Sequence, residues 1–163
     1  MKMPSLFYDL FESPVGTLFL IFSGKSLVKI SLKKPSDIAL KKGVASTSFI
    51  KELESYFQGS NAGFGQQIRF LTGTDFERKV WASLKDIPYG ETRTYKWIAE
   101  KAGSPSATRA AGRALSKNPV PIVLPCHRVI ESDGSVGGYS SGINMKIRLL
   151  ELEYYSKMNK KTV

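Results

Sequence analysis

The chain has 163 residues, with 24 Lys and Arg against 14 Asp and Glu, and its formal net charge is +10. So basic a chain favours nucleic acid as its partner over an anionic membrane surface, and its 42% hydrophobic content indicates a folded protein rather than a disordered basic tail. The single Cys and single His exclude an internal disulfide framework and a zinc site of the usual Cys and His ligands, so we expect no metal and no cofactor.

The amino-terminal residues show no export signal. Residues 1–13 contain one Lys and two acidic residues, and no continuous apolar stretch precedes a cleavage site. The strongest apolar run, residues 18–22, has only the length of a strand, so we expect no membrane span. With an unpaired Cys, these features favour an intracellular location, cytoplasmic in a prokaryote or nuclear in a eukaryote.

The first part of the chain, which we end at residue 73, is rich in short β-type runs. Residues 18–22 and 27–32 flank a turn at 23–26, which predicts an antiparallel hairpin. A basic, turn-rich stretch over 33–43 precedes a helix predicted at about 48–58, where apolar residues recur at helical spacing. Residues 67–71 are a candidate for one more strand.

The second part, residues 74–163, is predicted to be mostly helical. Thr74 and Glu77 form a capping-box pattern that begins a helix running to about residue 85. Thr94 is placed to cap a short helix over 95–102.

A helix-turn-helix is predicted next. Gly103 breaks the helix over 95–102, and Ser104-Pro105 predicts that another helix begins there and runs to about Lys117. Two short helices joined by a tight turn are typical of this motif. A Gly-rich loop over 134–142 and a final helix at about 144–155 complete the chain.

The stretch 101–130 has five basic residues and no carboxylate. Arg109, Arg113 and Lys117 recur at helical spacing on one face of the second helix of the turn, with Ser106 ahead of them. The opposite face is formed by Ala107, Ala111, Ala114 and Leu115. Such a row is ordinarily a solvated face. Its place on a helix-turn-helix favours contact with phosphates or bases.

The only Cys and the only His are neighbours, in Pro125-Cys126-His127-Arg128. A lone Cys is ordinarily an inert buried thiol, and a lone His is ordinarily structural. A thiol becomes a strong nucleophile, however, when a base or a cation lowers its pKa, and His127 and Arg128 supply both. Neighbours in a regular strand point to opposite faces, so the pair can cooperate only at a turn or through a bridging water.

A third group must orient the imidazole of His127. Glu151 and Glu153, on the predicted last helix, are the acidic candidates. Periodicity alone does not choose between them.

The segment around Cys126 resembles a known family, the O6-alkylguanine-DNA alkyltransferases, which repair alkylated DNA. The resemblance is carried by residues 118–130 (NPVPIVLPCHRVI), 137–142 (GGYSSG) and 146–150 (KIRLL). Thr94-Tyr95 and residues 109–112 (RAAG) lie upstream at the family's spacing, so the resemblance covers about residues 75–155.

The resemblance implies an α+β fold and a reaction. A small ribonuclease-H-like α/β domain would precede a mostly helical domain with a winged helix-turn-helix. The protein, a monomer, would flip O6-alkylguanine, or O4-alkylthymine, out of duplex DNA through the minor groove. It would then transfer the alkyl group irreversibly to Cys126, once per molecule.

The resemblance also implies a role for each matching residue. His127 would deprotonate Cys126 through water, and Glu153 would align His127. Asn118 would brace the active-site turn, and Tyr95 would donate to N3 of guanine. The base pocket would be lined by Val136, Gly137, Tyr139 and Ser140. Arg109 would fill the vacated place in the base stack, and the other DNA-binding residues would be Thr94, Ser104, Ala110, Gly112, Arg113 and Arg128.

Two other functions are compatible with these residues. A non-catalytic DNA-binding or damage-flagging protein could use the same helix-turn-helix, although such relatives lack the acceptor Cys that this chain has. A cysteine hydrolase would use the Cys, His and Glu set but gives the basic helix no role.

Overall fold

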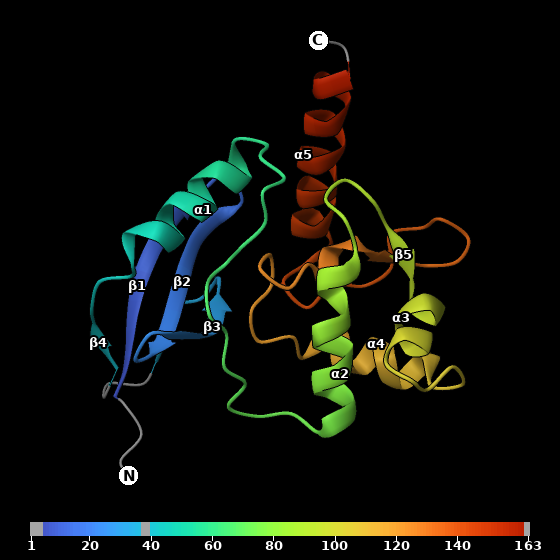
Figure 1. The fold of residues 1–163 in the computed structure, drawn as a ribbon, viewed down its shortest axis with the longest axis horizontal. Helices are drawn as coiled ribbons and strands as arrows, with labels where there is room; N and C mark the ends of the chain where they lie inside the picture. Colours follow the sequence, from blue (N-terminus) through green and yellow to red (C-terminus); the bar gives the residue numbers. More distant parts are fainter. Residues whose placement is uncertain (1–4, 37–39, 162–163) are drawn as a thin grey trace. The chain divides into compact units, whose positions relative to one another are not determined.

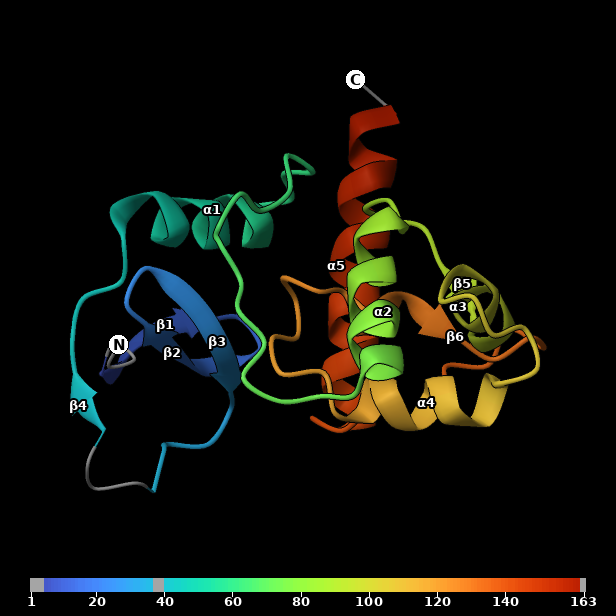
Figure 2. The same cartoon turned by 60° about the horizontal axis from the view of Figure 1, so that its bottom comes forward.

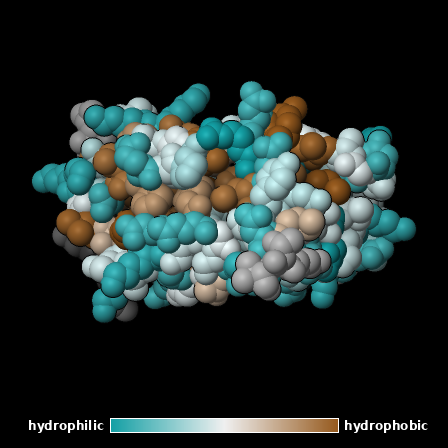
Figure 3. Space-filling model, turned by 90° about the horizontal axis from the view of Figure 1, so that it is seen from above, coloured by the Kyte–Doolittle hydropathy of each residue, from teal (hydrophilic) through white to brown (hydrophobic). Residues whose placement is uncertain are grey.

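The computed structural model describes residues 5–36 and 40–161 and divides into two units, Met1–Leu71 and Thr72–Val163 (Figure 1). Hydrophilic residues dominate the face in Figure 3 and separate small apolar areas. None of the described helices is both long enough and apolar enough to cross a membrane.

The first unit is a four-stranded sheet with a helix on one face. β1 (Leu6–Ser13), β2 (Gly16–Ser23) and β3 (Ser26–Ser31) are antiparallel neighbours, and the short β4 (Lys41–Lys42) pairs in parallel with β1. The strand order is β3-β2-β1-β4. The helix α1 (Thr47–Phe57) lies across β1 and β2, so apolar side chains from both layers form the core (Figure 1).

Aromatic rings join α1 to the sheet. The ring centroids of Phe22 and Phe49 lie 6.1 Å apart, and those of Phe11 and Phe57 lie 6.0 Å apart. Ser46 begins the helix by accepting a hydrogen bond from the backbone N–H of Phe49. These contacts fix the helix on the sheet by burying its apolar stripe.

The predicted hairpin and helix of this unit are confirmed, but the candidate strand over 67–71 is wrong. Only Ile68 forms a bridge, with Leu27, so this segment adds no strand to the sheet. β1 was not predicted, because Asp9 interrupts its apolar pattern. The carboxylate of Asp9 accepts a hydrogen bond from the backbone N–H of Ala45, at 2.8 Å. Residues 37–39 of the predicted turn-rich stretch lie outside the described part of the chain.

The second unit begins with α2 (Asp75–Ser83), which continues into the short 3-10 helix η1 (Leu84–Asp86). The predicted capping box is confirmed, since Thr74 and Glu77 each accept a hydrogen bond from the other's backbone N–H. The side chain of Trp81 is buried and donates to the carbonyl of Ala114, at 2.7 Å. This bond ties α2 to α4 (Thr108–Ser116).

The predicted pair of short helices is present, as α3 (Tyr95–Lys101) followed by α4 (Figure 2). Thr94 caps α3 by accepting from the backbone N–H of Trp97, as predicted. The indole of Trp97 is half-buried, with the cations of Arg93 and Lys101 over its ring at 5.6 and 5.4 Å. Trp97 therefore lies at the surface between two positive charges.

The predicted start of the second helix at Ser104 is wrong, because α4 begins at Thr108. The backbone N–H of Ser104 closes the preceding helix by donating to Ala99, and Gly103 adopts φ +84°. This is the hydrogen bonding of a Schellman motif. Ser104 then accepts from the N–H of Ala107, so Ser104 and Pro105 form a turn instead of capping a helix.

Four further elements complete the second unit. β5 (Arg93–Thr94) and β6 (Val129–Ile130) form a two-stranded parallel sheet. The last helix, α5 (Ile143–Lys161), extends six residues beyond its predicted end. The 3-10 helix η2 (Cys126–Arg128) lies against α5 and holds the Cys and His pair.

Candidate active site

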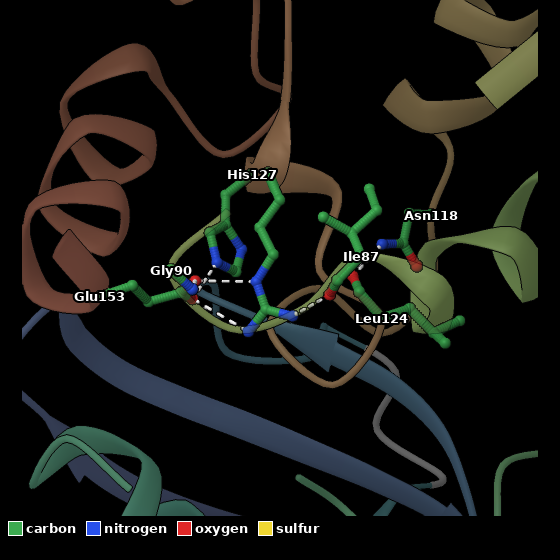
Figure 4. Close-up of polar contacts among 7 residues, drawn as sticks. Ile87, Gly90, Asn118, Leu124, His127 and Glu153 are labelled. Carbon is green, nitrogen blue, oxygen red and sulfur yellow. Dashed lines mark hydrogen bonds and ion pairs between the residues drawn. The ribbon is translucent and has the colours of Figure 1, made fainter. Parts of the chain in front are cut away.

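Cys126 lies at the start of η2, after an irregular turn over residues 118–125. The side chain of Asn118 closes this turn. Its Nδ2 donates to the carbonyl of Leu124 at 2.8 Å (Figure 4), and its Oδ1 accepts from the N–H of Val120 at 3.1 Å. Because Cys126 and His127 are in a 3-10 turn, the alternation of a strand, which would hold their side chains apart, does not apply.

Ile122, in the same turn, adopts φ +75° and is buried. A left-handed conformation is rare for a β-branched residue and costs about 1–2 kcal/mol. Such strain persists only where the surrounding structure imposes it. Here the imposing contacts are the two hydrogen bonds of Asn118 and the burial of the isoleucine side chain.

Cys126 opens onto a cavity of about 540 Å³ in the second unit. The predicted site residues Tyr95, Arg109, Gly112, Tyr139 and Ser140 line it together with the thiol. The cavity also has five lining residues that were not predicted: Thr108, Leu115, Ser116, Glu131 and Gly138. A nucleophile, two phenols and an arginine therefore share one pocket.

Behind Cys126, the His127 ring nitrogen Nε2 is hydrogen-bonded to Oε2 of Glu153 (Figure 4). Glu153 is buried on α5, whereas Glu151 is exposed, so the structure selects Glu153 of the two candidates. A carboxylate accepts hydrogen bonds only, so the imidazole proton lies on Nε2 and the lone pair of the neutral ring lies on Nδ1.

The carboxylate of Glu153 has further donors. Arg128 reaches it through Nε at 2.7 Å and Nη2 at 3.2 Å, and the backbone N–H of Gly90 reaches Oε1 at 3.1 Å. Arg128 also donates to the carbonyl of Ile87, at 2.7 Å. The predicted contact of Arg128 with DNA is therefore wrong, because its buried guanidinium is held inside the protein by Glu153 and Ile87.

The charges around His127 fix the protonation states. Burial raises the pKa of Glu153, but His127 and Arg128 lower it by more, to about 2. Burial lowers the pKa of His127, and this outweighs the attraction of Glu153. At neutral pH the pair is therefore a carboxylate and a neutral imidazole, the form in which His can accept a proton.

The environment of the thiol opposes and assists ionisation at once. Burial raises the pKa of Cys126, while hydrogen bonds from Asn118 and Tyr139 and the charge of Lys146 act in the opposite direction. Lys146 is buried on α5; its Nζ donates to the carbonyl of Gly138 at 3.1 Å and lies 5.8 Å from the ring centre of Tyr95. A thiolate would thus form next to a buried cation.

Sequence reasoning missed Lys146. The signal was its place on α5, where Lys146, Leu149 and Glu153 recur at helical spacing and all three are buried. A Lys on the buried stripe of a helix is unusual unless it serves a site.

Tyr95, the first residue of α3, approaches the Gly-rich loop closely. A Cβ on Gly137 would lie 2.8 Å from the Tyr95 hydroxyl, and Gly137 itself has φ +73°. Val136 was expected beside it in the base pocket but lines a second cavity of about 240 Å³, next to Gly90 and Glu153. Of the residues expected to contact DNA, Thr94 uses its hydroxyl in the helix cap, and Ser104 uses its backbone N–H and C=O in the turn described above.

Residues 101–130 contain no carboxylate, but three of their basic side chains pair with carboxylates from other parts of the chain. Lys117 pairs with Glu77 at 3.3 Å, Lys101 with Asp86 at 3.9 Å, and Arg128 with Glu153. Among the described residues, no carboxylate lies within 4 Å of Arg109 or Arg113, and both are exposed on α4 with Ala110 and Gly112 between them. These two arginines are the cations on this helix that remain available to an anionic partner.

Among the described residues, no group of three or more His, Cys, Asp and Glu side chains is placed to hold a metal ion.

Two family models match the chain. The first, "6-O-methylguanine DNA methyltransferase, ribonuclease-like domain", matches residues 6–70, and the second, "6-O-methylguanine DNA methyltransferase, DNA binding domain", matches residues 75–155. Sequence reasoning had found the resemblance only over the second of these ranges. The two matches confirm the predicted α+β fold, including the ribonuclease-like first part.

Similar proteins carry a consistent name. The methylated-DNA–protein-cysteine methyltransferase of Methanosarcina barkeri is 44% identical over 156 residues, 91% of this chain and 97% of its own. That of Mycobacterium leprae is 40% identical over 157 residues, 93% and 94% of the two chains. The crystal structure of Mycobacterium tuberculosis O6-methylguanine methyltransferase is 38% identical, covers 93% of this chain and 94% of its own, and has a TM-score of 0.84. A structure of the M. tuberculosis protein in complex with DNA is 39% identical, with coverages of 92% and 94% and a TM-score of 0.85.

Proposed function

The chain belongs to the 6-O-methylguanine DNA methyltransferase family, and on this premise we propose that it repairs O6-alkylguanine in duplex DNA by moving the alkyl group to Cys126. The observation that carries the proposal is the position of Cys126, which opens onto the cavity while His127 and Glu153 lie behind it. O4-alkylthymine is a second candidate lesion.

The transfer begins with a proton. Through a bridging water, the thiol of Cys126 gives its proton to Nδ1 of His127, and Glu153 stabilises the imidazolium that forms. Lys146 and the hydrogen bonds from Asn118 and Tyr139 stabilise the thiolate. This arrangement compensates for the burial that otherwise keeps the thiol protonated.

The sulfur then attacks the alkyl carbon. An S–C bond forms while the bond from that carbon to O6 of guanine breaks, and the hydroxyl of Tyr95 donates to N3 so that guanine does not leave as a bare anion. The product is a thioether on Cys126. Because no group in the site reverses a thioether bond, each molecule reacts once.

The base must leave the stack to reach Cys126. A base inside a duplex is inaccessible to the thiol, and extruding it costs a few kcal/mol. Arg109 lines the cavity from α4 and would occupy the vacated place in the stack, with the small residues Ala110 and Gly112 allowing the helix to enter the minor groove. Ser140 and Tyr139 would line the pocket for the flipped base.

We also propose that a monomer is the active form, in the cytoplasm of a prokaryotic cell or the nucleus of a eukaryotic one. The cavity, the His127–Glu153 pair and the basic face of α4 all come from residues 72–163 of one chain. A lone thiol that must stay reduced suits an intracellular compartment.

The first prediction tests the acceptor directly. Incubation with duplex DNA containing one O6-methylguanine should add about 14 Da, the mass of one methyl group replacing a proton, to the peptide that contains Cys126. With excess DNA, transfer should stop at one methyl group per protein molecule. Intact and peptide mass spectrometry measure both, with unmethylated DNA and a Cys126→Ser variant as controls.

The alternative functions give different results. Tight binding to methylated DNA with no adduct on Cys126 would indicate a damage-flagging protein. Hydrolysis of a simple ester by the wild type but not by Cys126→Ser would indicate a hydrolase. More than one methyl group removed per molecule would contradict the single-turnover reaction.

A further inference from the structure

The small parallel sheet places a carboxylate next to Tyr95. In the β5–β6 ladder, Arg93 pairs with Val129 and Thr94 pairs with Ile130. The residues that follow, Tyr95 and Glu131, therefore leave the two parallel strands side by side at the same end. Tyr95 begins α3, and Glu131 begins the loop that leads into the Gly-rich segment.

The side chains of this pair meet at the cavity. The Tyr95 hydroxyl lies 2.8 Å and the Glu131 Oε1 lies 3.4 Å from the position that a Cβ would occupy on Gly137. Both residues line the cavity onto which Cys126 opens. Among the described residues that line it, Glu131 is the only carboxylate.

The backbone holds Glu131 in place. Its N–H donates to the carbonyl of Ser135 at 3.0 Å, and its carbonyl accepts from the N–H of Gly134 at 3.0 Å. This closed turn follows β6 directly, so the carboxylate is attached to a fixed part of the unit. The Glu131 side chain is exposed and adds one formal negative charge to this edge of the cavity.

The cations near the cavity do not cancel this charge by contact. No carboxylate of the described residues lies within 4 Å of Lys146 or Arg109. Lys146 is buried, its Nζ donates to the carbonyl of Gly138, and its charge interacts with both Cys126 and Glu131. A substrate group that enters the cavity therefore meets both the carboxylate of Glu131 and the guanidinium of Arg109 on its walls.

We propose that Glu131 is a specificity-determining residue that disfavours O6-alkyl groups carrying a negative charge relative to neutral ones of similar size. The inference rests on the proposed alkyl transfer and goes beyond it by ranking the lesions. An O6-carboxymethyl group and an O6-methyl group differ chiefly in the added carboxylate, so this pair of lesions isolates the effect of charge.

The size of the effect follows from Coulomb's law. Two like charges within about 6 Å, in a site open to solvent, change a rate by about threefold to tenfold. Neutralising Glu131 should raise the rate constant for the carboxymethyl lesion by this factor relative to the methyl lesion. A general gain in DNA affinity would affect both lesions equally, and it cancels in the ratio.

The experiment measures second-order rate constants for both lesions in the same duplex sequence. The expected result is that Glu131→Gln raises the carboxymethyl-to-methyl ratio about threefold to tenfold. The matched control is Asp133→Asn, which removes the same charge from the same loop. Asp133 is bound to Ser135 and does not line the cavity, so the ratio should remain at the wild-type value.

A second measurement varies the salt concentration. Raising the ionic strength should bring the ratio of the wild type closer to that of Glu131→Gln, because salt screens the charge of the exposed Glu131 while Arg109 is common to both proteins. An unchanged ratio in Glu131→Gln, with both lesions still reacting, would overturn the inference and leave the proposed function intact. An equal rise in Asp133→Asn would overturn it too. If the wild type transfers neither group, the proposed function fails and the inference with it.

Discussion

The carboxylate of Glu153 joins four parts of the second unit: α5, the imidazole of His127, the guanidinium of Arg128 and the N–H of Gly90. A buried ion pair is a weak source of net stability, since desolvation offsets most of the attraction. Removing one partner is costly, because the other charge then remains buried alone. Glu153 therefore stabilises the second unit through these contacts and is also the residue proposed to orient His127.

This role predicts a specific response to acid. The pKa of Glu153 is lowered from 4.5 to about 2, so the stabilisation of about 3 kcal/mol is fully present above pH 4.5 and is lost as the pH falls toward 2. The pKa of buried His127 is lowered from 6.5, so the unfolded chain takes up a proton first and stability already begins to fall below pH 6.5. Urea unfolding from pH 2 to 8 measures both effects.

Glu153→Gln should lower the free energy of unfolding at pH 7 by about 3–5 kcal/mol, since Arg128 loses its carboxylate. It should also reduce the change in the free energy of unfolding between pH 4.5 and pH 2. The control is Glu151→Gln, two residues away on the exposed face of α5, which should change neither. A wild-type slope retained in Glu153→Gln would show that another carboxylate is responsible.

Substitutions of two glycines in the loop over 134–142 distinguish the effect of backbone strain from the effect of steric contact with the site. Gly134 has φ +88° and open space where a Cβ would lie, whereas Gly137 has φ +73° and the Tyr95 hydroxyl 2.8 Å from that position. Both Gly→Ala variants should lose about 1–2 kcal/mol of stability, the cost of a left-handed alanine.

Only Gly137→Ala should also slow alkyl transfer, by about tenfold or more, because the new methyl group displaces Tyr95. Single-turnover rates and urea unfolding of both variants test this. Equal rates of alkyl transfer in the two variants would mean that displacing Tyr95 does not slow the reaction.

The site was predictable where unusual residues carried the signal. Cys126 and His127 stand out because each is the only residue of its type in the chain. The prediction that Arg128 contacts DNA was wrong because a sequence does not show that an arginine has a buried carboxylate partner 25 residues away. Glu131 was missed because its position depends on the pairing of β5 with β6, two strands of two residues each.

At the scale of elements, α4 is the helix that we propose enters the DNA. Three residues of its predicted apolar side, Ala111, Ala114 and Leu115, are buried, and its exposed side presents Arg109 and Arg113. The fourth, Ala107, precedes the helix and is only half-buried. The two arginines lie one helical turn apart, but Arg109 lines the cavity and Arg113 does not. The same helix thus carries one arginine that reaches the cavity and another that does not.

This difference predicts two separable effects. Arg109→Ala should lower the transfer rate by about 100-fold, as expected when an extruded base is no longer replaced in the stack. Arg113→Ala should weaken binding to all duplexes alike and reduce the slope of log affinity against log salt by about 1.

Rates at saturating protein, together with salt titrations of binding, distinguish the two effects. If Arg113→Ala slowed the chemical step as much as Arg109→Ala, the proposed role of Arg109 in filling the vacated place in the stack would be wrong.

Helices were predicted where side chains form their own caps. Thr74 with Glu77, and Thr94 alone, fixed the starts of α2 and α3. The start of α4 was wrong because the backbone of Ser104 serves the end of α3, a use that local residue preferences do not show. β1 was missed because its exposed and half-buried residues do not form the apolar run that identified β2.

At the scale of the whole molecule, both units are basic. Nine basic and five acidic residues give residues 1–71 a charge of +4, and fifteen and nine give residues 72–163 a charge of +6. Only the second unit contains the cavity with Cys126. The positive charge of the first unit is consistent with non-specific attraction to a polyanion, which needs no pocket.

The positions of the two tryptophans determine which unit tryptophan fluorescence reports on. Trp81 and Trp97 both lie in the second unit, one fully buried against α4 and the other half-buried between two cations. Tryptophan emission therefore reports on residues 72–163 alone, while far-ultraviolet circular dichroism reports on both units. The separation between the two melting curves is then a direct reading of how far the ribonuclease-like unit unfolds independently of the unit that carries Cys126.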